Sequence, residues 1–143
     1  MKKVLFLCTG NSCRSQMAEG WAKKLFPDGV EAYSAGTNPG KVDPRAIKAM
    51  AEAGVDISGH RSKHAGEFRD MVFDLVVTVC DKARESCPVW VGKAKKIHKN
   101  FEDPPFLAKD AITEKEALDH YRRVRDEIRD FIKELPKNLE EIK

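Results

Sequence analysis

The sequence predicts a three-layer α/β domain built on a four-stranded parallel sheet. Short, largely apolar runs are typical of strands that are buried on both faces of such a sheet, and the 143-residue chain contains four candidate stretches of this kind. Segments with apolar residues at helical spacing separate the four runs. Because strands and helices alternate, we expect right-handed crossover connections with helices on the faces of the sheet.

The four candidate strands cover residues 4–7, 30–34, 73–79 and 96–98. The first three are largely apolar, and the fourth is the weakest. Ligands of parallel α/β sheets bind beyond the carboxyl ends of the strands. Cys8, which directly follows the first strand, is therefore delivered to the edge of the sheet where a site is expected.

Two helices are expected between the first three strands. The first has apolar residues at helical spacing from Ala18 to Phe26 and ends at the Pro-Asp-Gly turn that follows. The second begins with Asp43 as the N-cap, has Pro44 at its first helical position and ends before Gly54.

The clearest helix lies near the end of the chain. Thr113 and Glu116 form a capping box at its start, and Pro136 marks its end. Its apolar stripe consists of residues at helical spacing, namely Leu118, Tyr121, Val124, Ile128, Phe131 and Leu135. We interpret residues 1–143 as one domain with a charged tail after about residue 135.

Composition and charge exclude several classes of function. The chain has 26 Lys and Arg against 23 Asp and Glu, a net charge of +3, and the two signs are interspersed, so no nucleic-acid footprint is visible. No apolar run approaches the ~20 residues of a membrane span, and the run after Lys3 is too short for a secretion signal. We therefore expect a cytoplasmic protein without a nucleic-acid or membrane partner.

Residues 8–15 join the first strand to the first helix and read Cys-Thr-Gly-Asn-Ser-Cys-Arg-Ser. The backbone N–H groups of a short loop at a helix N-terminus form an anion-binding nest, and the helix dipole adds to its positive field. This loop is predicted to hold a tetrahedral oxyanion through Thr9, Gly10, Asn11, Ser12, Cys13, Arg14 and Ser15.

Individual residues of this loop have distinct expected roles. Gly10 is expected to allow a tight turn because it lacks a Cβ, and Arg14 to present a planar fork of donors to two anion oxygens. The field that attracts an anion also favours thiolate over thiol, so Cys8 is the expected nucleophile. Cys13 is expected to be a small packing residue. The alternative is that Cys8 is a buried structural cysteine followed by an incidental arginine.

Other polar residues are less specific. Cys80 and Cys87 are too far apart for the usual zinc-binding pair and no second pair follows, so without Cys8 they would be interpreted as buried bystander thiols. His60 and His64 lie in a stretch expected to be irregular and solvated, and no metal site is predicted. Asp103 alone is typical of a turn before two prolines.

Residues 8–21, Cys-Thr-Gly-Asn-Ser-Cys-Arg-Ser-Gln-Met-Ala-Glu-Gly-Trp, resemble the active-site segment of the low-molecular-weight tyrosine phosphatase superfamily, specifically its thioredoxin-coupled arsenate reductases. The resemblance continues at residues 33–36, 77–80, 87–88 and 102–104. The Cys-x5-Arg-Ser element is common to phosphatases and reductases, whereas the later cysteine pair, seven positions apart, distinguishes the reductases. The resemblance implies a flavodoxin-like sheet of order 2-1-3-4 and reduction of arsenate to arsenite by thioredoxin. We expect a monomer without a bound cofactor.

The resemblance also assigns residue roles. The Cys8 thiolate attacks arsenate, Arg14 stabilises charge on the oxygens, and Asp103 matches the family's general acid. Attack by Cys80 then releases arsenite and leaves a Cys8–Cys80 disulfide. Cys87 attacks Cys80 in turn and carries the oxidation outward as a Cys80–Cys87 disulfide.

The last step has a geometric requirement. One continuous helix over residues 80–87 would separate the two Cα atoms by ~10.5 Å, whereas a disulfide tolerates only about 4.4–6.8 Å. Residues 81–86 are therefore expected to loop out on oxidation, which would expose the bridge to thioredoxin.

A cation site is expected to be replaced. In potassium-binding members of the reductase family, residues matching Asn11, Glu19 and Ser34 help to hold the ion together with a carboxylate, and here Lys63 stands at the carboxylate position. Its ammonium group can neutralise Glu19 and support the loop, so activity is expected to be indifferent to potassium. The alternative is that Lys63 is a solvated surface charge.

Two other functions stay open. The first is a phosphatase of the same fold. Such phosphatases commonly present aromatic residues just after the Asp-Pro pair to flank a phosphotyrosine ring, whereas here Pro105 and Phe106 follow, so a tyrosine pair is missing and only Phe106 could contribute. The second is a non-catalytic oxyanion-binding or redox-sensing module. Phosphate or sulfate is expected to occupy the same loop as arsenate, because the loop recognises tetrahedral shape and charge.

Overall fold

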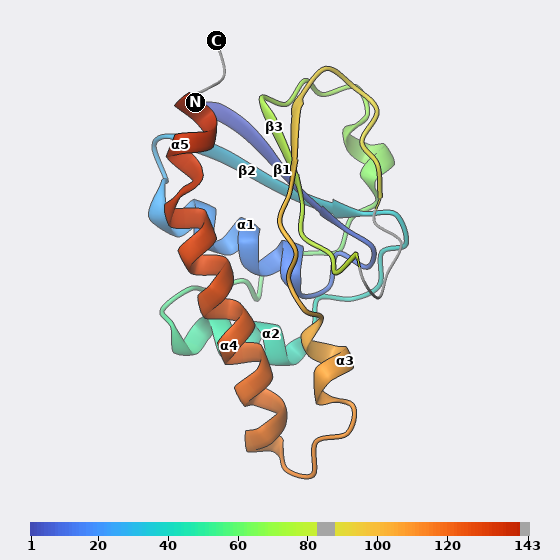
Figure 1. Ribbon diagram of the computed structural model, residues 1–143, viewed down its shortest axis with the longest axis vertical. Helices are drawn as coiled ribbons and strands as arrows, with labels where there is room; N and C mark the ends of the chain where they lie inside the picture. The colour runs from blue at the N-terminus through green and yellow to red at the C-terminus, as the bar shows by residue number, and fades with distance from the viewer. Residues whose placement is uncertain (83–87, 141–143) are drawn as a thin grey trace.

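A parallel sheet of four strands forms the centre of the molecule (Figure 1). The structure, a computed structural model, describes residues 1–82 and 88–140. The predicted fold class, with its strand order β2-β1-β3-β4, is confirmed. The strands are β1 (Lys2–Cys8), β2 (Val30–Gly36), β3 (Leu75–Thr78) and β4 (Lys95–His98).

The pairing register brings the carboxyl ends of the strands to one edge of the sheet. Cys8 pairs with Gly36 between β1 and β2, and Leu7 pairs with Thr78 between β1 and β3. Thr78 also pairs with His98 of β4. The edge at which a ligand is expected is therefore formed by the residues that follow these strand ends.

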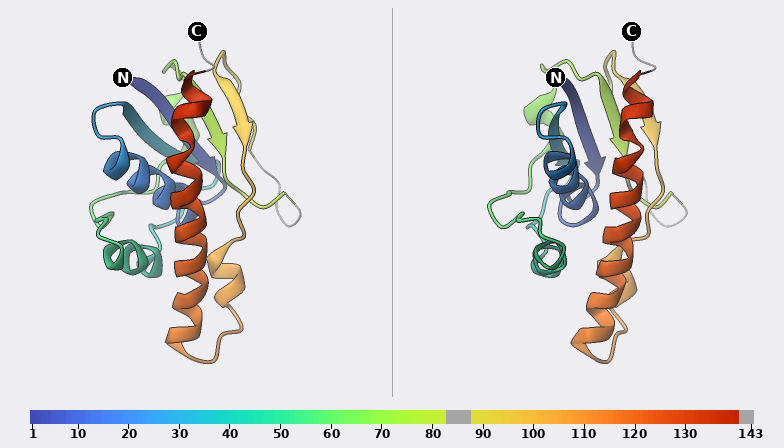
Figure 2. Two further views of the ribbon diagram at one scale, coloured as in Figure 1. Left: turned by 60° about the vertical axis from the view of Figure 1, so that its left-hand side comes forward. Right: turned by 90° about the vertical axis from the view of Figure 1, so that its left-hand side faces the viewer.

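The side chains of β1 alternate between two hydrophobic cores, because successive residues of a strand point to opposite faces. Val4 and Phe6 belong to the larger core, where α1 (Arg14–Leu25), α2 (Pro44–Glu52) and α4 (Glu114–Lys133) pack. Figure 2 shows α1 and α4 side by side on this face of the sheet.

Shorter pieces of chain cover the second face. Leu5 and Leu7 pack there with Phe73, Trp90 and η1 (Ala65–Phe68), which is a 3-10 helix. The Phe73 ring meets the Trp90 indole edge to face, with 5.6 Å between the ring centroids. Burial on both faces explains why the sequence of β1 is continuously apolar.

The third strand is shorter than predicted. Regular pairing covers Leu75–Thr78 rather than residues 73–79. The carboxylate of Asp74 accepts the backbone N–H of Lys3 at 2.8 Å, and the Asp74 N–H donates to the Lys3 carbonyl at 2.9 Å. The Asp74 side chain thus accepts a hydrogen bond that a main-chain carbonyl would accept in a regular ladder, and regular pairing of β3 with β1 begins at Leu75.

Residues 135–140 form a helix where a charged tail was predicted. α4 ends at Lys133, close to the predicted end at Pro136, and α5 (Leu135–Glu140) follows, with Leu139 buried. The prediction of a tail after about residue 135 is therefore wrong for residues 135–140. A proline is tolerated in the first turn of a helix because the N–H that it lacks has no intrahelical partner there.

The caps of the predicted helices are present. Asp43 caps α2, and the Thr113 hydroxyl accepts the backbone N–H of Glu116 at 3.1 Å at the start of α4. The sequence analysis omits one helix of the site region, α3 (Pro104–Ala108). Asp103 is its N-cap residue, which places this carboxylate directly before a helix that begins with two prolines.

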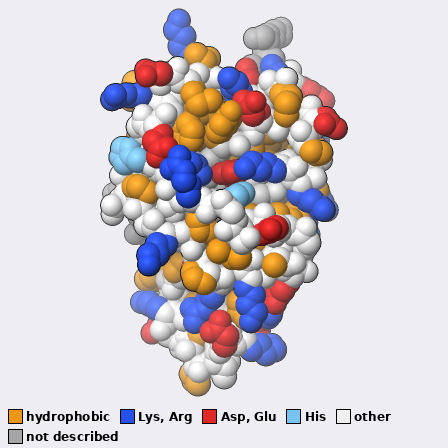
Figure 3. Space-filling model, turned by 180° about the vertical axis from the view of Figure 1, so that it is seen from behind, with side chains coloured by type: hydrophobic (Ala, Val, Ile, Leu, Met, Phe, Trp, Pro, Cys, Tyr) orange, Lys and Arg blue, Asp and Glu red, His pale blue; other side chains and the backbone are white. Residues whose placement is uncertain are grey.

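The face of the molecule in Figure 3 carries Lys and Arg side chains interspersed with Asp and Glu. Exposed ion pairs such as Arg45–Glu114 and Arg122–Glu52 join α2 to α4, and pairs of this kind contribute only about 0–1 kcal/mol each. None of the helices within residues 1–82 and 88–140 has the length and apolar character that crossing a membrane requires.

Candidate active site

The predicted oxyanion loop surrounds a cavity of about 260 Å³ at the carboxyl edge of the sheet. Asp103 and Pro105, from the start of α3, close its other side. Of the loop residues, six line the cavity, namely Cys8, Thr9, Gly10, Ser12, Cys13 and Arg14. The side chains of Asn11 and Ser15 are fully buried and lie behind the loop rather than along the cavity.

Ser15 and Asn11, which lie behind the loop, form a chain of hydrogen bonds to the Cys8 sulfur. The Cys8 Sγ lies 2.9 Å from the Ser15 Oγ, which accepts a hydrogen bond from the Asn11 Nδ2 at 2.8 Å. Because the Ser15 oxygen already accepts from Asn11, its own proton is available to the Cys8 sulfur. A hydroxyl that donates to sulfur is the arrangement that suits a thiolate nucleophile.

Asn11, rather than Gly10, has the unusual backbone conformation of this loop. Asn11 adopts a φ of 46°, a region in which asparagine is better tolerated than most residues. Gly10 has no positive φ, and a Cβ on it would lie at an ordinary 3.7 Å from the Cβ of Ser12. The predicted reason for a glycine at position 10 is therefore wrong.

Gly36 is the glycine that the loop requires. A Cβ at this position would lie 2.3 Å from the Thr9 carbonyl oxygen and 2.9 Å from the Asn11 nitrogen. Both contacts are with backbone, which cannot rotate away as a side chain can. The absence of a Cβ at the end of β2 therefore allows the oxyanion loop to pack directly against the neighbouring strand.

Arg14 is a buried guanidinium that contacts the opposite wall of the cavity. Its Nη1 donates to the Phe101 carbonyl at 3.0 Å, and its Nη2 lies 3.7 Å from the Asp103 Oδ1. The Asp103 side chain is 32% exposed and lines the cavity without capping α3. The structure thus brings together the predicted nucleophile Cys8, the predicted anion-binding Arg14 and the predicted general acid.

Cys80 lies at the neighbouring strand end. The Val79 N–H donates to the Leu7 carbonyl at 3.0 Å, so the chain just before Cys80 runs beside the chain just before Cys8. Cys80 is fully buried and disulfide-bonded, whereas Cys8 and Cys13 carry free thiols. Cys87 lies outside the described residues, as do most of residues 81–86, so the Cys80–Cys87 pairing and the predicted looping out stay predictions.

Cys13 both packs in the hydrophobic core and lines the cavity. It is the N-cap residue of α1 and 3% exposed, and it belongs to the larger core, as the sequence analysis expects of a packing residue. Burial, followed by the negative charges of Asp43 and Asp103, raises the pKa of the Cys13 thiol well above its ordinary value. Cys13 therefore stays protonated at neutral pH.

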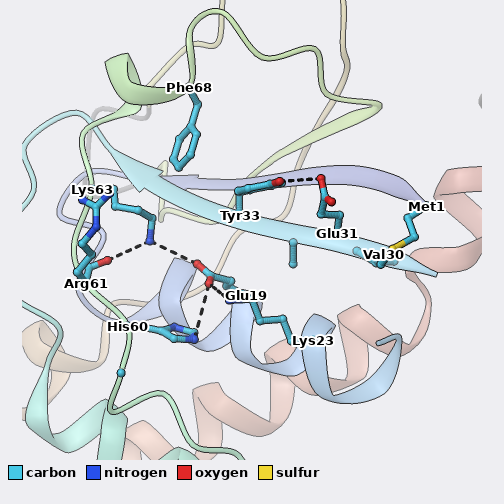
Figure 4. Close-up of a pocket in the computed structure, with 12 residues that line it drawn as sticks. Met1, Glu19, Lys23, Val30, Glu31, Tyr33, His60, Arg61, Lys63 and Phe68 are labelled. Atoms are coloured by element: carbon cyan, nitrogen blue, oxygen red, sulfur yellow. Dashed lines mark hydrogen bonds and ion pairs between the residues drawn. The ribbon is translucent and has the colours of Figure 1, made fainter. Parts of the chain in front are cut away.

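Glu19, Ser34 and Lys63 form a buried cluster behind the loop, and Figure 4 shows the Lys63 ammonium group facing the Glu19 carboxylate. The Lys63 Nζ lies 3.5 Å from both the Glu19 Oε1 and the Ser34 Oγ, and it donates to the Arg61 carbonyl at 3.0 Å. The Lys63 side chain is only 12% exposed, so it is not a solvated surface charge. The ammonium group stands beside the carboxylate, as the sequence analysis proposes.

The pKa shifts of this cluster reflect burial and pairing. Burial alone would raise the pKa of Glu19, but hydrogen bonds from Lys23 and Ser34 and the charge of Lys63 outweigh it, so the pKa is lower than usual. Burial lowers the pKa of Lys63, and the attraction of Glu19 opposes this effect. Glu19 is therefore ionised at neutral pH, and it depends on its donors to remain so in a buried position.

Sequence reasoning misses two residues that connect this cluster to the loop. Gln16 is fully buried and donates through Nε2 to the Asn11 Oδ1 at 2.9 Å, and its Oε1 lies 2.9 Å from the His60 Nδ1. The His60 Nε2 lies 3.7 Å from the Glu19 Oε2, and burial lowers the pKa of His60. His60 is thus part of the support of the loop rather than a solvated histidine. The one available signal was a lone glutamine directly after Arg14-Ser15.

Metal ligands are not gathered at this site. Among the residues that the structure describes, no group of three or more His, Cys, Asp or Glu side chains is placed to hold a metal ion. His64 instead caps η1, with its Nδ1 accepting the N–H of Gly66 at 2.9 Å. The two histidines therefore have separate roles, one in the support of the loop and one at a turn.

Comparison with known proteins decides the family. The model of the low molecular weight phosphotyrosine protein phosphatases matches residues 3–143. The chain belongs to this family. The match covers the oxyanion loop, all four strands and α3, so the family likeness and the geometry of the site concern the same part of the molecule.

Within this phosphatase family, similar proteins are arsenate reductases. One from Halalkalibacterium halodurans is 47% identical over 132 residues, which cover 92% of this chain and 93% of that protein. A solved arsenate reductase in the phosphate binding state is 34% identical, with a TM-score of 0.80 over 97% of this chain and 99% of the other. A thioredoxin-dependent arsenate reductase from Corynebacterium glutamicum is 26% identical, with a TM-score of 0.68 over 98% of this chain and 62% of the other. The resemblance noted in the sequence is thereby confirmed.

Proposed function

We propose that this chain reduces arsenate to arsenite through a covalent adduct on Cys8. The observation that carries the proposal is one cavity lined by Cys8, Arg14 and Asp103, at a strand edge that also bears Cys80. The names of the similar proteins support arsenate as the substrate. A nucleophile, an anion clamp and an acid in one cavity are the parts that displacement at a tetrahedral oxyanion requires.

In the first step the Cys8 thiolate attacks the arsenic atom. A sulfur–arsenic bond forms and the bond between arsenic and one of its hydroxyl groups breaks, and that hydroxyl takes a proton from Asp103 and departs as water. Arg14 and the backbone N–H groups of the loop stabilise negative charge on the remaining oxygens. Arsenic remains pentavalent in this adduct.

In the second step the Cys80 thiolate attacks the sulfur of Cys8. A disulfide forms, the sulfur–arsenic bond breaks, and its electron pair goes to arsenic, which leaves as trivalent arsenite. Cys87 then displaces Cys8 from Cys80, which regenerates the Cys8 thiolate and leaves a Cys80–Cys87 disulfide. The dithiol of thioredoxin supplies the two electrons that reduce this bridge, so the cycle needs no bound cofactor. A thioredoxin-dependent relative supports this choice of reductant.

Hydrolysis of small phosphoesters is the second candidate activity. The cavity binds by tetrahedral shape and charge, and a relative in the phosphate binding state supports phosphate as a ligand of the same loop. Phe106 is 39% exposed just after the Asp-Pro pair, with the Lys109 Nζ 4.2 Å from the centre of its ring. Phe106 follows Pro105 of the cavity wall but does not itself line the cavity, so a phosphotyrosine would have little to stack on and we expect weak hydrolysis.

The decisive assay measures arsenite formation and phosphoester hydrolysis on the same reduced protein. We expect many arsenite molecules per enzyme with thioredoxin, thioredoxin reductase and NADPH, and slow hydrolysis of p-nitrophenyl phosphate. A parallel reaction with glutathione and glutaredoxin identifies the reductant. Hydrolysis without arsenite would make the protein a phosphatase, and a single arsenite per enzyme that thioredoxin does not increase would make it a redox-sensing module.

Lys63 is proposed to replace a dissociable cation. We expect exchange of sodium chloride for potassium chloride at equal ionic strength to change neither the melting temperature nor the arsenite rate. Lys63→Met is expected to lower the free energy of unfolding by about 1–3 kcal/mol, because it leaves the buried Glu19 carboxylate with fewer donors. In Lys63→Asp a second carboxylate faces Glu19, and Lys23 is the ammonium group that still pairs with Glu19, so potassium should now raise the melting temperature.

Lys23→Met is the matched control for Lys63→Met. Lys23 bonds the same Glu19 carboxylate from a side chain that is 51% exposed, whereas Lys63 is 12% exposed, so solvent can partly replace the Lys23 ammonium group and we expect a smaller loss of stability in Lys23→Met than in Lys63→Met. Differential scanning fluorimetry in the two salts checks all four proteins. A clear potassium stimulation of the unmodified enzyme would contradict the proposed role of Lys63.

A further inference from the structure

Asn100 contacts the chain that leaves Cys80. It follows β4 closely, and its Oδ1 accepts the backbone N–H of Lys82 at 2.8 Å. Its Nδ2 donates to the Asp81 Oδ1 at 3.3 Å. One amide group thus binds the backbone of one residue and the carboxylate of another, both directly after Cys80.

The Asn100 side chain is itself oriented by the end of the sheet. The His98 Nε2 lies 3.3 Å from the Asn100 Oδ1, and the His98 Nδ1 lies 2.7 Å from the Thr78 Oγ1. The Nε2–H tautomer of His98 satisfies both contacts, since it donates to Asn100 and accepts from Thr78. Asn100 is therefore connected to the last paired residues of both β3 and β4.

The short stretch of chain that contains Asn100 also contacts Arg14 of the oxyanion loop. Phe101 directly follows Asn100, and its carbonyl accepts the Nη1 of Arg14 at 3.0 Å. Asp103, two residues further, lies 3.7 Å from the Nη2 of Arg14. Residues 98–103 thus contact the loop that would carry the arsenic adduct and the chain that carries Cys80.

Cys80 is disulfide-bonded in this structure, and we propose that Asn100 holds the chain after Cys80 in the same place when Cys80 is a thiol, so that it is a positioning residue for that thiol; this inference rests on the proposed function. Asn100 does not line the cavity around Cys8, so it has no direct part in binding the oxyanion. Attack on Cys8 requires the two sulfur atoms to approach in line and form a bond of about 2.05 Å. An error of about 1 Å in such a geometry can slow a reaction by about 10²-fold.

Only an amide suits both contacts of position 100. The Lys82 N–H needs an acceptor, and the Asp81 carboxylate, which is only 4% exposed, needs a donor. An aspartate at the exposed position 100 would keep the acceptor but would place a second negative charge beside the buried Asp81 carboxylate, and the two like charges would repel. Alanine would remove both contacts.

The first test is Asn100→Ala in the reduced, full-length protein. Single-turnover arsenite release without thioredoxin reports attack by Cys80, and we expect it to fall about 10–100-fold. Hydrolysis of p-nitrophenyl phosphate needs no Cys80, and it is expected to stay within about twofold of the unmodified protein. Lys99→Ala, at the adjacent exposed position, is the matched control and should change neither rate.

A donor–acceptor exchange separates positioning from loss of stability. Asn100→Asp alone is expected to slow arsenite release as much as Asn100→Ala. Combined with Asp81→Asn, it restores a donor opposite an acceptor, and arsenite release should recover at least threefold. Equal losses of arsenite release and hydrolysis in Asn100→Ala, unchanged arsenite release, or no recovery in the double variant would each overturn the proposal.

A readout without arsenate keeps this test apart from the proposed function. If the unmodified protein forms no arsenite, the proposed function is wrong, and the role of Asn100 is then decided by the equilibrium of a Cys8–Cys80 disulfide with dithiothreitol, measured in a Cys87→Ser background. This disulfide requires Cys80 to be held toward Cys8, so Asn100→Ala should make it about tenfold easier to reduce, equivalent to about 30 mV. An unchanged equilibrium would overturn the positioning role.

Discussion

Cys80→Ser is expected to stop arsenite formation with the thioredoxin system, by roughly 10³-fold or more, while hydrolysis of p-nitrophenyl phosphate continues. A serine oxygen cannot form the disulfide that breaks the sulfur–arsenic bond, so the adduct on Cys8 can only return to arsenate. Hydrolysis should persist because it uses Cys8, Arg14 and Asp103, which line a cavity that does not include Cys80. Arsenite is measured by liquid chromatography with elemental detection.

Cys87→Ser provides the matched comparison, because it removes the thiol of the following step. We expect one arsenite per enzyme and then arrest, with Cys8 and Cys80 joined in a disulfide that mass spectrometry detects. Continued turnover in Cys80→Ser would mean that another thiol, or an external one, attacks the adduct, and the relay would then be wrong. Equal thermal stability of the variants and the unmodified protein excludes unfolding as the cause.

Gly36→Ala is expected to lower arsenite formation and phosphoester hydrolysis together, by about 10²-fold. The added methyl group would lie 2.3 Å from the Thr9 carbonyl oxygen and 2.9 Å from the Asn11 nitrogen, so the oxyanion loop must shift. We expect the free energy of unfolding to fall by about 1–3 kcal/mol, as for other overpacked sites. Steady-state kinetics with both substrates and denaturant unfolding check this result.

Gly29→Ala is the control for the same chemical change. A Cβ at Gly29 meets no atom within 4 Å, so its effect on stability should stay within about 0.5 kcal/mol and its activities should be unchanged. Full activity of Gly36→Ala would show that the loop tolerates displacement, which would contradict the close packing of the loop on β2 as a requirement of the site.

The sheet and the oxyanion loop could be predicted because their signals are local. The apolar run before Cys8 marks a strand buried on both faces, and the capping pair Thr113 and Glu116 marks the start of α4. α5 could not be predicted in the same way. A proline such as Pro136 is common both just after the end of a helix and in the first turn of a new one, so it does not distinguish the two cases. Only the burial of Leu139 against the core distinguishes the two cases.

The part of the loop support that Gln16 and His60 provide could not be predicted, because it depends on contacts between distant segments. Gln16 and His60 are 44 positions apart in the chain, yet their side chains meet at 2.9 Å. The requirement for glycine at position 36 likewise arises from the approach of the oxyanion loop, a segment distant in sequence, whereas the prediction for Gly10 rested only on its place in a loop. Lys63 was identified through family resemblance, and nothing in its neighbouring residues indicates that it is buried.

One partner of Arg14 is a main-chain acceptor, the carbonyl of residue 101, in addition to the Asp103 carboxylate 3.7 Å away. Every amino acid provides a carbonyl, so no substitution at position 101 deletes this hydrogen bond, although a change of side-chain shape can move it. The side chain of residue 101 can therefore vary during evolution without removal of the carbonyl that accepts the hydrogen bond from Arg14. Contacts of this site that are made by main-chain atoms are therefore less sensitive to substitution than contacts made by side chains.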